Sequence, residues 1–202
     1  RNATGANGGP ARLEPEPVGG TPQQPAFRTG GLDQVALHPN FARNNLVYFT
    51  YNKAGEPGAA PNQRQSAITI ARGRFDGKTL TGVEEIFVGD WSNGASGSRL
   101  AFGLDGLLYV TTGAPFGDQA QDPATVYGKV LRLRDDGAVP PDNPFVGRAG
   151  TRHEILSLGH RDQLGLTVHQ PSGAILSAEH GPNGGDEGNV ILAGRNHGWS
   201  TS

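Results

Sequence analysis

Short apolar runs separated by tight-turn residues recur along this chain, and this pattern most limits how it can fold. Residues 99–113 consist of two short apolar runs joined by Leu-Asp-Gly, and residues 165–181 consist of two runs joined by Pro-Ser-Gly. Residues 32–51 hold two more runs around a His-Pro-Asn turn region. Asp-Gly between alternating strands is a strong hairpin signal. The pattern predicts an all-β chain in which residues 66–75 and 128–137 supply further strands.

The predicted hairpins resemble one another and return at a similar interval. The turn glycines Gly106 and Gly173 and the Asn44–Asn45 turn follow one another at intervals of roughly 60–70 residues. No segment has the periodicity of an amphipathic helix of useful length. A hairpin repeated at this spacing favours the blades of a β-propeller with long connections. A β-sandwich is the alternative, although its turns would come more evenly.

Composition bounds the domain organisation and excludes several kinds of function. The chain has 202 residues, a net charge of −2 and no cysteine. The absence of a basic run argues against a nucleic-acid partner, and the absence of cysteine excludes disulfides and thiolate metal sites. No apolar run is long enough for a membrane span. We predict an extended lead-in over residues 1–27, rich in Gly and Pro, and a propeller domain over residues 28–202.

One stretch combines flexible and charged residues, namely EHGPNGGDEGN at residues 179–189. Glycines let backbone carbonyls turn outward. Carbonyls and carboxylates together form the hard-oxygen site that calcium prefers. The alternative interpretation is a surface loop of turn-forming residues.

A second cluster, His160, Arg161 and Asp162, lies between two apolar stretches. Side chains at such a junction between strand and loop can reach a shared cavity. Arginine is the side chain best suited to clamp carboxylate or phosphate oxygens. The alternative is a surface ion pair.

Five strings occur in the same order as in the soluble glucose/sorbosone dehydrogenases, also called PQQ-dependent aldose sugar dehydrogenases. They are GLDQVALHPNF, SRLAFGLDGLLYV, AQDPATVYGKVLRLRDDGAVPPDNPF, EILSLGHRDQLGL and EHGPNGGDEGNVILAGRNHGW. The chain resembles this family over residues 28–199. The resemblance implies a six-bladed β-propeller, present here only in part as about three to four blades. It also implies oxidation of the C1 hydroxyl of aldoses with pyrroloquinoline quinone (PQQ) and calcium, in a periplasmic or secreted protein.

The resemblance implies roles for individual residues. Arg161 is implied to bind PQQ. Asp162 is implied to bind it too, but the family has Asn there, so Asp162 brings a negative charge towards an anionic cofactor. Gly181 and Pro182 are implied to offer backbone carbonyls to the cofactor calcium.

The same comparison of motifs implies a structural calcium site as well. The glutamate of the family's Gly-Gly-Asp-Glu string corresponds to Glu187. The backbone carbonyl ten residues further on corresponds to that of His197. These two residues are therefore predicted metal ligands.

Three departures from the family pattern concern catalysis. The general-base histidine of the family corresponds to Ala95, its acidic orienting partner to Ala114, and a glutamine to Thr29. Alanine cannot accept a proton, and general-base help contributes about 10²–10⁴ in rate. We therefore expect impaired oxidation unless Asp118 substitutes as the base. The alternative function is a non-catalytic propeller that binds a sugar or a protein partner.

The expected partner is a small-molecule aldose, together with an electron acceptor that no motif identifies. Family members extend beyond the Asn-His-Gly-Trp string, and the chain contains no methionine. We expect a processed or trimmed product that lacks blades at both ends. Exposed strand edges of an incomplete propeller favour self-association.

Overall fold

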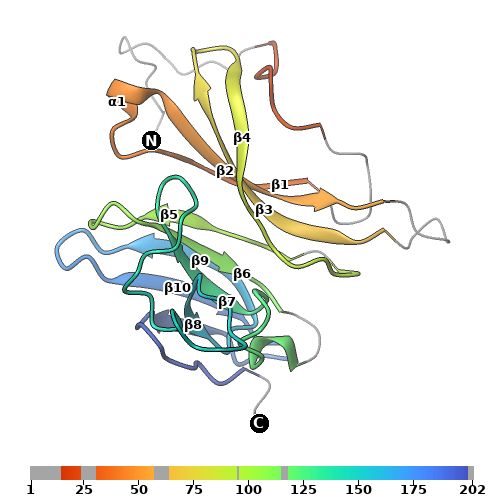
Figure 1. Cartoon of the computed structure of the whole chain (residues 1–202), viewed down its shortest axis with the longest axis vertical. Coiled ribbons are helices and arrows are strands. Elements are labelled where there is room, and N and C mark those ends of the chain that lie inside the picture. The colour runs from red at the N-terminus through yellow and green to blue at the C-terminus, as the bar shows by residue number, and fades with distance from the viewer. Residues whose placement is uncertain (1–14, 24–30, 57–63, 95, 115–117, 200–202) are drawn as a thin grey trace.

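The computed structural model describes residues 15–23, 31–56, 64–94, 96–114 and 118–199. These residues form strands and turns almost throughout (Figure 1), which confirms the predicted all-β class. Among them, only α1 (Phe41–Asn44) and the 3-10 turn η1 (Asp118–Ala120) are helical. No helix in the described ranges has the length and apolar character needed to cross a membrane.

The described strands pair into three antiparallel sheets, each made of strands that follow one another in the chain. The first sheet contains β1 (Gly31–Leu37), β2 (Leu46–Ala54), β3 (Ser66–Phe75) and β4 (Leu80–Val88). The second contains β5 (Leu100–Phe102), β6 (Leu108–Thr112), β7 (Lys129–Leu133) and β8 (Ile155–Leu158). The third contains β9 (Asp162–Val168), β10 (Ile175–His180) and β11 (Glu187–Val190). This up-and-down order within each sheet is that of a propeller blade.

The predicted strand at residues 66–75 coincides with β3, and each predicted hairpin is present. Three strands, namely β4, β8 and β11, were not predicted, because their sequences carry only weak strand signals. β4 carries two adjacent glutamates, β8 has only four residues, and β11 reads Glu-Gly-Asn-Val. Pairing with neighbouring strands, rather than intrinsic propensity, therefore makes these segments extended.

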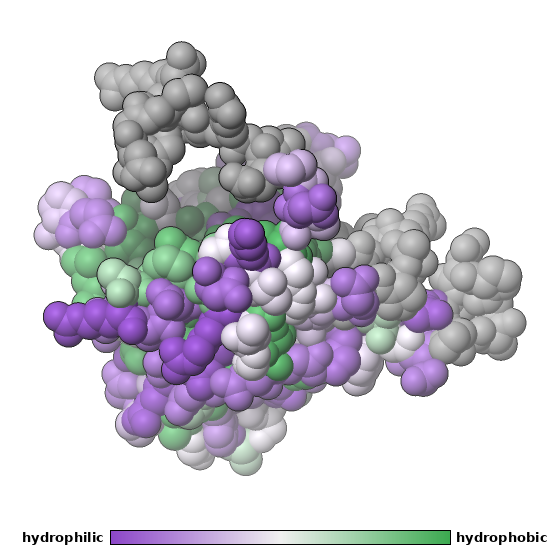
Figure 2. Space-filling view, turned by 90° about the horizontal axis from the view of Figure 1, so that it is seen from above, coloured by the Kyte–Doolittle hydropathy of each residue, from purple (hydrophilic) through white to green (hydrophobic). Residues whose placement is uncertain are grey.

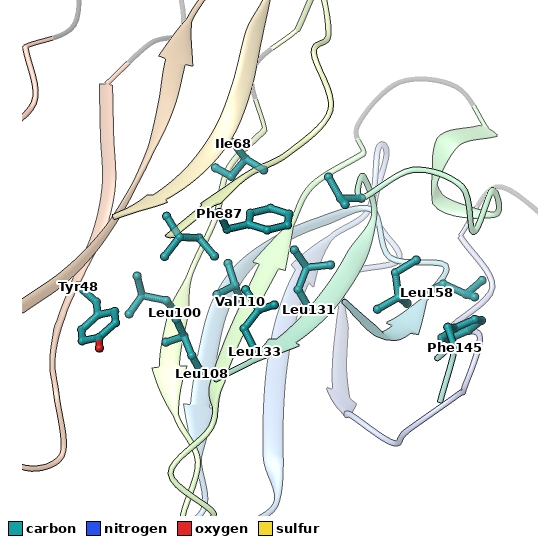
Figure 3. Packing of buried hydrophobic residues seen from close by; sticks show 13 residues of the cluster. Tyr48, Ile68, Phe87, Leu100, Leu108, Val110, Leu131, Leu133, Phe145 and Leu158 are labelled. Carbon is teal, nitrogen blue, oxygen red and sulfur yellow. The ribbon is translucent and has the colours of Figure 1, made fainter. Parts of the chain in front are cut away.

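The main hydrophobic core joins the first sheet to the second (Figure 3). Tyr48, Ile68 and Phe87 from the first sheet face Leu100, Val110 and Leu131 from the second. Most of these side chains are almost fully buried, so packing between the two sheets excludes water. A smaller core holds the second sheet to the third, and its buried members are Tyr109, Val130, Leu156, Ile175 and Ile191.

The far face of the first sheet is apolar and partly exposed. The edge strand β1 presents Leu32, Val35 and Leu37 with more than half of each side chain exposed. Figure 2, which views the molecule from the side of this sheet, shows apolar side chains between polar ones. Only part of the predicted lead-in is described, and Gly19 within it forms a parallel bridge with Thr79. Self-association through exposed strand edges stays a prediction.

A fully buried lysine on β7 holds the long connection between β6 and β7. Lys129 donates from Nζ to the backbone carbonyls of Gln119 (2.8 Å), Ala120 (3.1 Å) and Tyr127 (2.6 Å). Burial lowers the pKa of Lys129 to about 8, while Asp122 and Asp90 oppose that shift. The three carbonyls therefore satisfy an ammonium group that is costly to bury.

Replacing this lysine tests its structural role. In Lys129→Met three buried carbonyls lose their donor, so we expect the free energy of unfolding to fall by about 3 kcal/mol. The exposed Lys78→Met is the matched control, with an expected change within about 0.5 kcal/mol. Urea unfolding measures both variants. Equal stabilities would show that Lys129 does not hold this connection.

The lowered pKa of Lys129 also predicts a pH dependence of stability. The unfolded chain keeps its proton up to the ordinary pKa of 10.5, whereas the folded chain loses it from about pH 8. Folding is thus penalised below pH 8, and the penalty is relieved as pH rises between the two values. The stability of the unmodified chain should rise, relative to Lys129→Met, by roughly 1.5 kcal/mol from pH 8 to 9.5. A flat or falling difference in urea unfolding would contradict the shift.

Candidate functional site

The first strands of the three sheets lie side by side, with β5 between β1 and β9. Just before β5, the hydroxyl of Ser98 hydrogen-bonds Thr50 Oγ1 at 2.6 Å and Asp33 Oδ2 at 3.4 Å. On the other side, Gly97 lies against the carboxylate of Asp162, the first residue of β9. Residues 96–98 therefore link the beginnings of β1, β5 and β9, which are the first strands of the three sheets.

A bulge in β1 brings Asp33 into this region. The pairing of β1 with β2 shifts register between Leu32 and Gln34, so Asp33 is the extra residue. Its carboxylate accepts a 3.0 Å hydrogen bond from Asn52, whose amide also donates to the Ser96 carbonyl. Burial raises the pKa of Asp33 to about 6, although Ser98 and Arg99 lower it in part. Bulges often redirect a side chain next to a functional site, and this one turns a carboxyl group towards the second sheet.

Glu179 on β10 organises the opposite side of the region. Its Oε1 contacts His160 Nδ1 at 3.0 Å and accepts from Asn189 Nδ2 at 2.5 Å, while Oε2 accepts from the Arg161 backbone N–H at 2.8 Å. Burial alone would raise the pKa of Glu179, but its hydrogen bonds and the electrostatic effect of the neighbouring His160 outweigh burial and hold the pKa below its ordinary value. An ionised Glu179 therefore fixes the segment that carries Arg161.

The His160 ring completes an order of groups known from serine hydrolases. Its Nε2 lies 2.8 Å from Ser157 Oγ, so a ring that donates from Nδ1 to Glu179 accepts from the serine hydroxyl. Ser157 and His160 are both fully buried, however, and no substrate carbonyl can reach the serine. The network positions the neighbouring backbone and is not a hydrolytic triad.

Arg161 extends from this network towards the start of the turn that follows β10. Its guanidinium donates to the His180 carbonyl at 2.8 Å and lies over the Trp199 ring at 5.3 Å. The Trp199 indole in turn donates to the Ala114 carbonyl. Arg161 Nε is buried and hydrogen-bonds no described residue. A donor left without a partner beside a fixed guanidinium suits an anionic oxygen of a ligand.

The other implied cofactor residue, Asp162, points elsewhere. A methyl group built on Gly113 would lie 3.2 Å from Asp162 Oδ1, and one built on Gly97 would lie 3.6 Å from it. The carboxylate thus lies between the loop before β5 and the residue that follows β6. The structure separates it from the direction taken by Arg161.

Of the three positions that the resemblance implies for the family's catalytic groups, the structure describes one, Ala114. Ala114 is almost fully buried, and its N–H donates to the Arg161 carbonyl at 2.5 Å. Ala95 and Thr29 lie outside the described residues. Asp118 is exposed at the start of η1, and only its backbone carbonyl makes a described hydrogen bond. The structure therefore brings Ala114 next to the Arg161–Asp162 segment, whereas Asp118 stays a predicted substitute.

The glycine-rich stretch forms a tight turn between β10 and β11. A Cβ on Gly181 would lie 1.9 Å from the Gly184 carbonyl oxygen, so only glycine fits there. Asp186 accepts from the Gly181 N–H at 3.0 Å. Arg161 binds the carbonyl of His180, the residue that directly precedes Gly181 in the chain.

The two predicted ligands of the structural calcium lie near the same network. Glu187 is exposed and accepts from Asn189 Nδ2 at 3.0 Å. The His197 ring stacks on His160 with centroids 4.3 Å apart. Burial lowers the pKa of His197, and the charge of Glu187 partly opposes this shift, which places the two within electrostatic range. The described residues contain no cluster of three or more His, Asp or Glu side chains suited to a metal. Calcium here would need backbone carbonyls as ligands.

Sequence reasoning missed several residues that build this site, namely Asp33, Gln121, Asn189 and Trp199. Trp199 ends one of the five family strings, and its ring lies against the Arg161 guanidinium. Gln121 fixes it by donating to the Trp199 carbonyl at 2.7 Å. Trp199 and Arg161 are far apart in the sequence, so the sequence alone does not show that the indole ring stacks on the guanidinium.

Comparisons with known proteins show which family the chain is similar to. The family model described as Glucose / Sorbosone dehydrogenase matches residues 10–202. The aldose sugar dehydrogenase YliI of Escherichia coli is 36% identical over 91% of this chain and 49% of its own length. The apo-form of the soluble aldose sugar dehydrogenase of Escherichia coli superposes with a TM-score of 0.83 at 32% identity, over 98% of this chain and 56% of that one.

A third relative is a PQQ-bound structure, that of the aldose sugar dehydrogenase of Streptomyces coelicolor. Its TM-score is 0.73 at 31% identity, over 92% of this chain and 52% of that one. The chain thus spans about half the length of the relatives it matches. The three sheets are blades of a β-propeller that is present here in part. Both the family model and the identities show that the chain belongs to the glucose/sorbosone dehydrogenase family.

Proposed function

We propose that this chain binds PQQ beside Arg161 and takes part in the oxidation of the C1 hydroxyl of aldose sugars. The observation that carries the proposal is the fixed guanidinium of Arg161, whose buried Nε has no hydrogen-bond partner among the described residues. PQQ is anionic and carries carboxylates, which a guanidinium binds in a forked geometry. When bound, PQQ supplies the acceptor for the two electrons that leave the sugar.

The chain's own residues would hold the cofactor in two ways. Arg161 would bind a carboxylate, and the carbonyls of Gly181 and Pro182 would bind the associated calcium. Glu179 keeps Arg161 in place through its backbone N–H, and Trp199 limits the movement of its guanidinium. Arg161 is therefore preorganised and loses little side-chain freedom on binding.

Domain organisation and localisation follow the same proposal. Residues 28–202 would act as the cofactor-binding part of a propeller, in a periplasmic or secreted protein. The sugar would enter as a small-molecule substrate, and an external acceptor would reoxidise the cofactor.

A second candidate function is a propeller that binds a sugar or a partner without oxidising it. Its supporting observation is Ala114, a buried alanine next to Arg161 that cannot orient or accept a proton. Cofactor binding with no sugar oxidation would favour this second function.

The arginine is the most direct target for a test. Arg161→Lys keeps the charge but loses the planar fork, so we expect PQQ to bind about tenfold more weakly. Titration with PQQ in the presence of calcium, followed by absorbance and Trp fluorescence, gives the affinity. Reduction of an artificial dye with glucose tests oxidation in the same samples.

The matched control for this variant is Arg148→Lys. Arg148 also lies over an aromatic ring, that of Phe145 at 5.1 Å, but in the turn-rich segment between β7 and β8. Its PQQ affinity should equal that of the unmodified chain. If Arg161→Lys and Arg148→Lys bind PQQ equally well, the cofactor does not use Arg161.

Calcium should stabilise the fold through the predicted ligands Glu187 and His197. An ion that binds only the folded state raises the melting temperature. We expect millimolar calcium to raise it in the unmodified chain and in Glu16→Gln, which removes an exposed carboxylate elsewhere. The shift should largely disappear in Glu187→Gln. Absence of any shift, or an equal shift in all three proteins, would exclude Glu187 as a ligand.

A further inference from the structure

The carboxylate of Asp162 lies where three segments of the site meet. It lies next to Gly97 in the loop before β5 and Gly113 after β6, because a Cβ built on either glycine would come within 3.6 Å of Asp162 Oδ1. These segments are tied together, because the Gly113 N–H donates to Ser96 Oγ at 2.6 Å and to the Gly97 carbonyl at 3.1 Å. A side chain larger than hydrogen at Gly113 would press on the carboxylate, so the glycine leaves room for it.

This carboxylate differs from Glu179 and Asp33 because its side chain accepts no hydrogen bond from the part of the chain that the structure describes. Glu179 is saturated by three hydrogen bonds, and Asp33 accepts from Asn52 and Ser98. No described residue donates a hydrogen bond to the Asp162 side chain, which is partly exposed. An acidic group without a structural partner, open to solvent within a site, is available to a substrate.

Asp162 lies near segments that adjoin Ala95 and Ala114 in the sequence, the positions at which the resemblance implies a base and its partner. Ala114 directly follows Gly113 and binds the carbonyl that precedes Asp162. In the chain, Gly97 lies two residues beyond Ala95, the position of the family's base. The structure thus places the Asp162 carboxylate next to Gly97 and Gly113, which are close in the sequence to the positions where the resemblance implies the base and its partner.

We propose that Asp162 is the general base of this chain and accepts the proton of the sugar C1 hydroxyl. The proposal rests on the proposed function. It replaces the role in cofactor binding that the family resemblance implied for Asp162. If Asp162 is the base, the absence of the family's general-base histidine no longer predicts a loss of sugar oxidation.

The proposed oxidation balances in atoms and electrons when PQQ is the electron acceptor. The O1–H bond of the aldose breaks, and its proton goes to a carboxylate oxygen of Asp162. The C1–H bond would break with its electron pair, and PQQ, when bound, would accept these two electrons as a hydride. A C1=O double bond forms, so the sugar becomes a lactone. The proton then leaves Asp162 for solvent.

The charges around Asp162 suit this role. Arg161 directs its guanidinium to the His180 carbonyl, and Arg99 is bound to the carbonyls of Leu164 and Ser98. Neither arginine forms an ion pair with Asp162. Its negative charge should nevertheless repel an anionic cofactor, so the proposal predicts a cost in PQQ affinity that the amide of asparagine would not impose.

The test compares Asp162→Asn with the unmodified chain at saturating PQQ and calcium. We expect single-turnover glucose oxidation to slow by about 10²–10⁴. PQQ should bind about threefold more tightly, because a nearby like charge is removed. Asp76→Asn is the matched control: Asp76 is an exposed turn residue, and asparagine can keep its hydrogen bonds to Lys78 and Thr79. Adding Ala95→His and Ala114→Asp to Asp162→Asn should restore part of the rate.

Several results would overturn the assignment. Unchanged oxidation in Asp162→Asn would exclude it, as would loss of oxidation in Asp118→Asn with Asp162→Asn still active. An unmodified chain that binds PQQ but never oxidises a sugar would also exclude it and favour the binding function. Failure to bind PQQ at all would refute the proposed function itself, and the base assignment with it.

Discussion

The site depends on one buried carboxylate, that of Glu179. It binds the His160 ring, the Arg161 backbone and the Asn189 amide at once, and so joins β10, β11 and the segment that leads into β9. A buried charge is tolerated only where it is well satisfied, so removal of any partner would leave a costly unpaired group. The directions of Arg161 and of the following residue, Asp162, both follow from this arrangement.

The sequence predicted the class of fold and most strands, because alternating apolar residues and Asp-Gly turns are local signals. It missed β8 and β11, since a four-residue strand becomes extended only through its neighbours. In the site, Arg161 and the Gly181 turn were found through family motifs. Asp33 and Trp199 were not recognised, because a bulge and a contact between distant residues bring them there. The placement of Asp162 against Gly113 likewise depends on the packing of separate sheets.

The departures from the family pattern acquire a common explanation in the structure. The resemblance implies alanines at the positions of the base and of its partner, and under the proposal above Asp162 supplies a carboxylate in their place. The exchange of Asn for Asp, which looks unfavourable for an anionic cofactor, then provides the missing proton acceptor. Arg161 keeps its own support, because Glu179 accepts a hydrogen bond from its backbone N–H. Cofactor binding and proton transfer are thus assigned to neighbouring residues that point in different directions.

A crystal structure of the chain with PQQ, calcium and a non-oxidisable sugar analogue tests this division most directly. The account predicts a cofactor carboxylate on the Arg161 guanidinium, calcium on the carbonyls of Gly181 and Pro182, and the C1 oxygen of the analogue within hydrogen-bond distance of the Asp162 carboxylate. A cofactor bound away from Arg161, or an Asp162 carboxylate that binds the cofactor instead of the sugar, would contradict it.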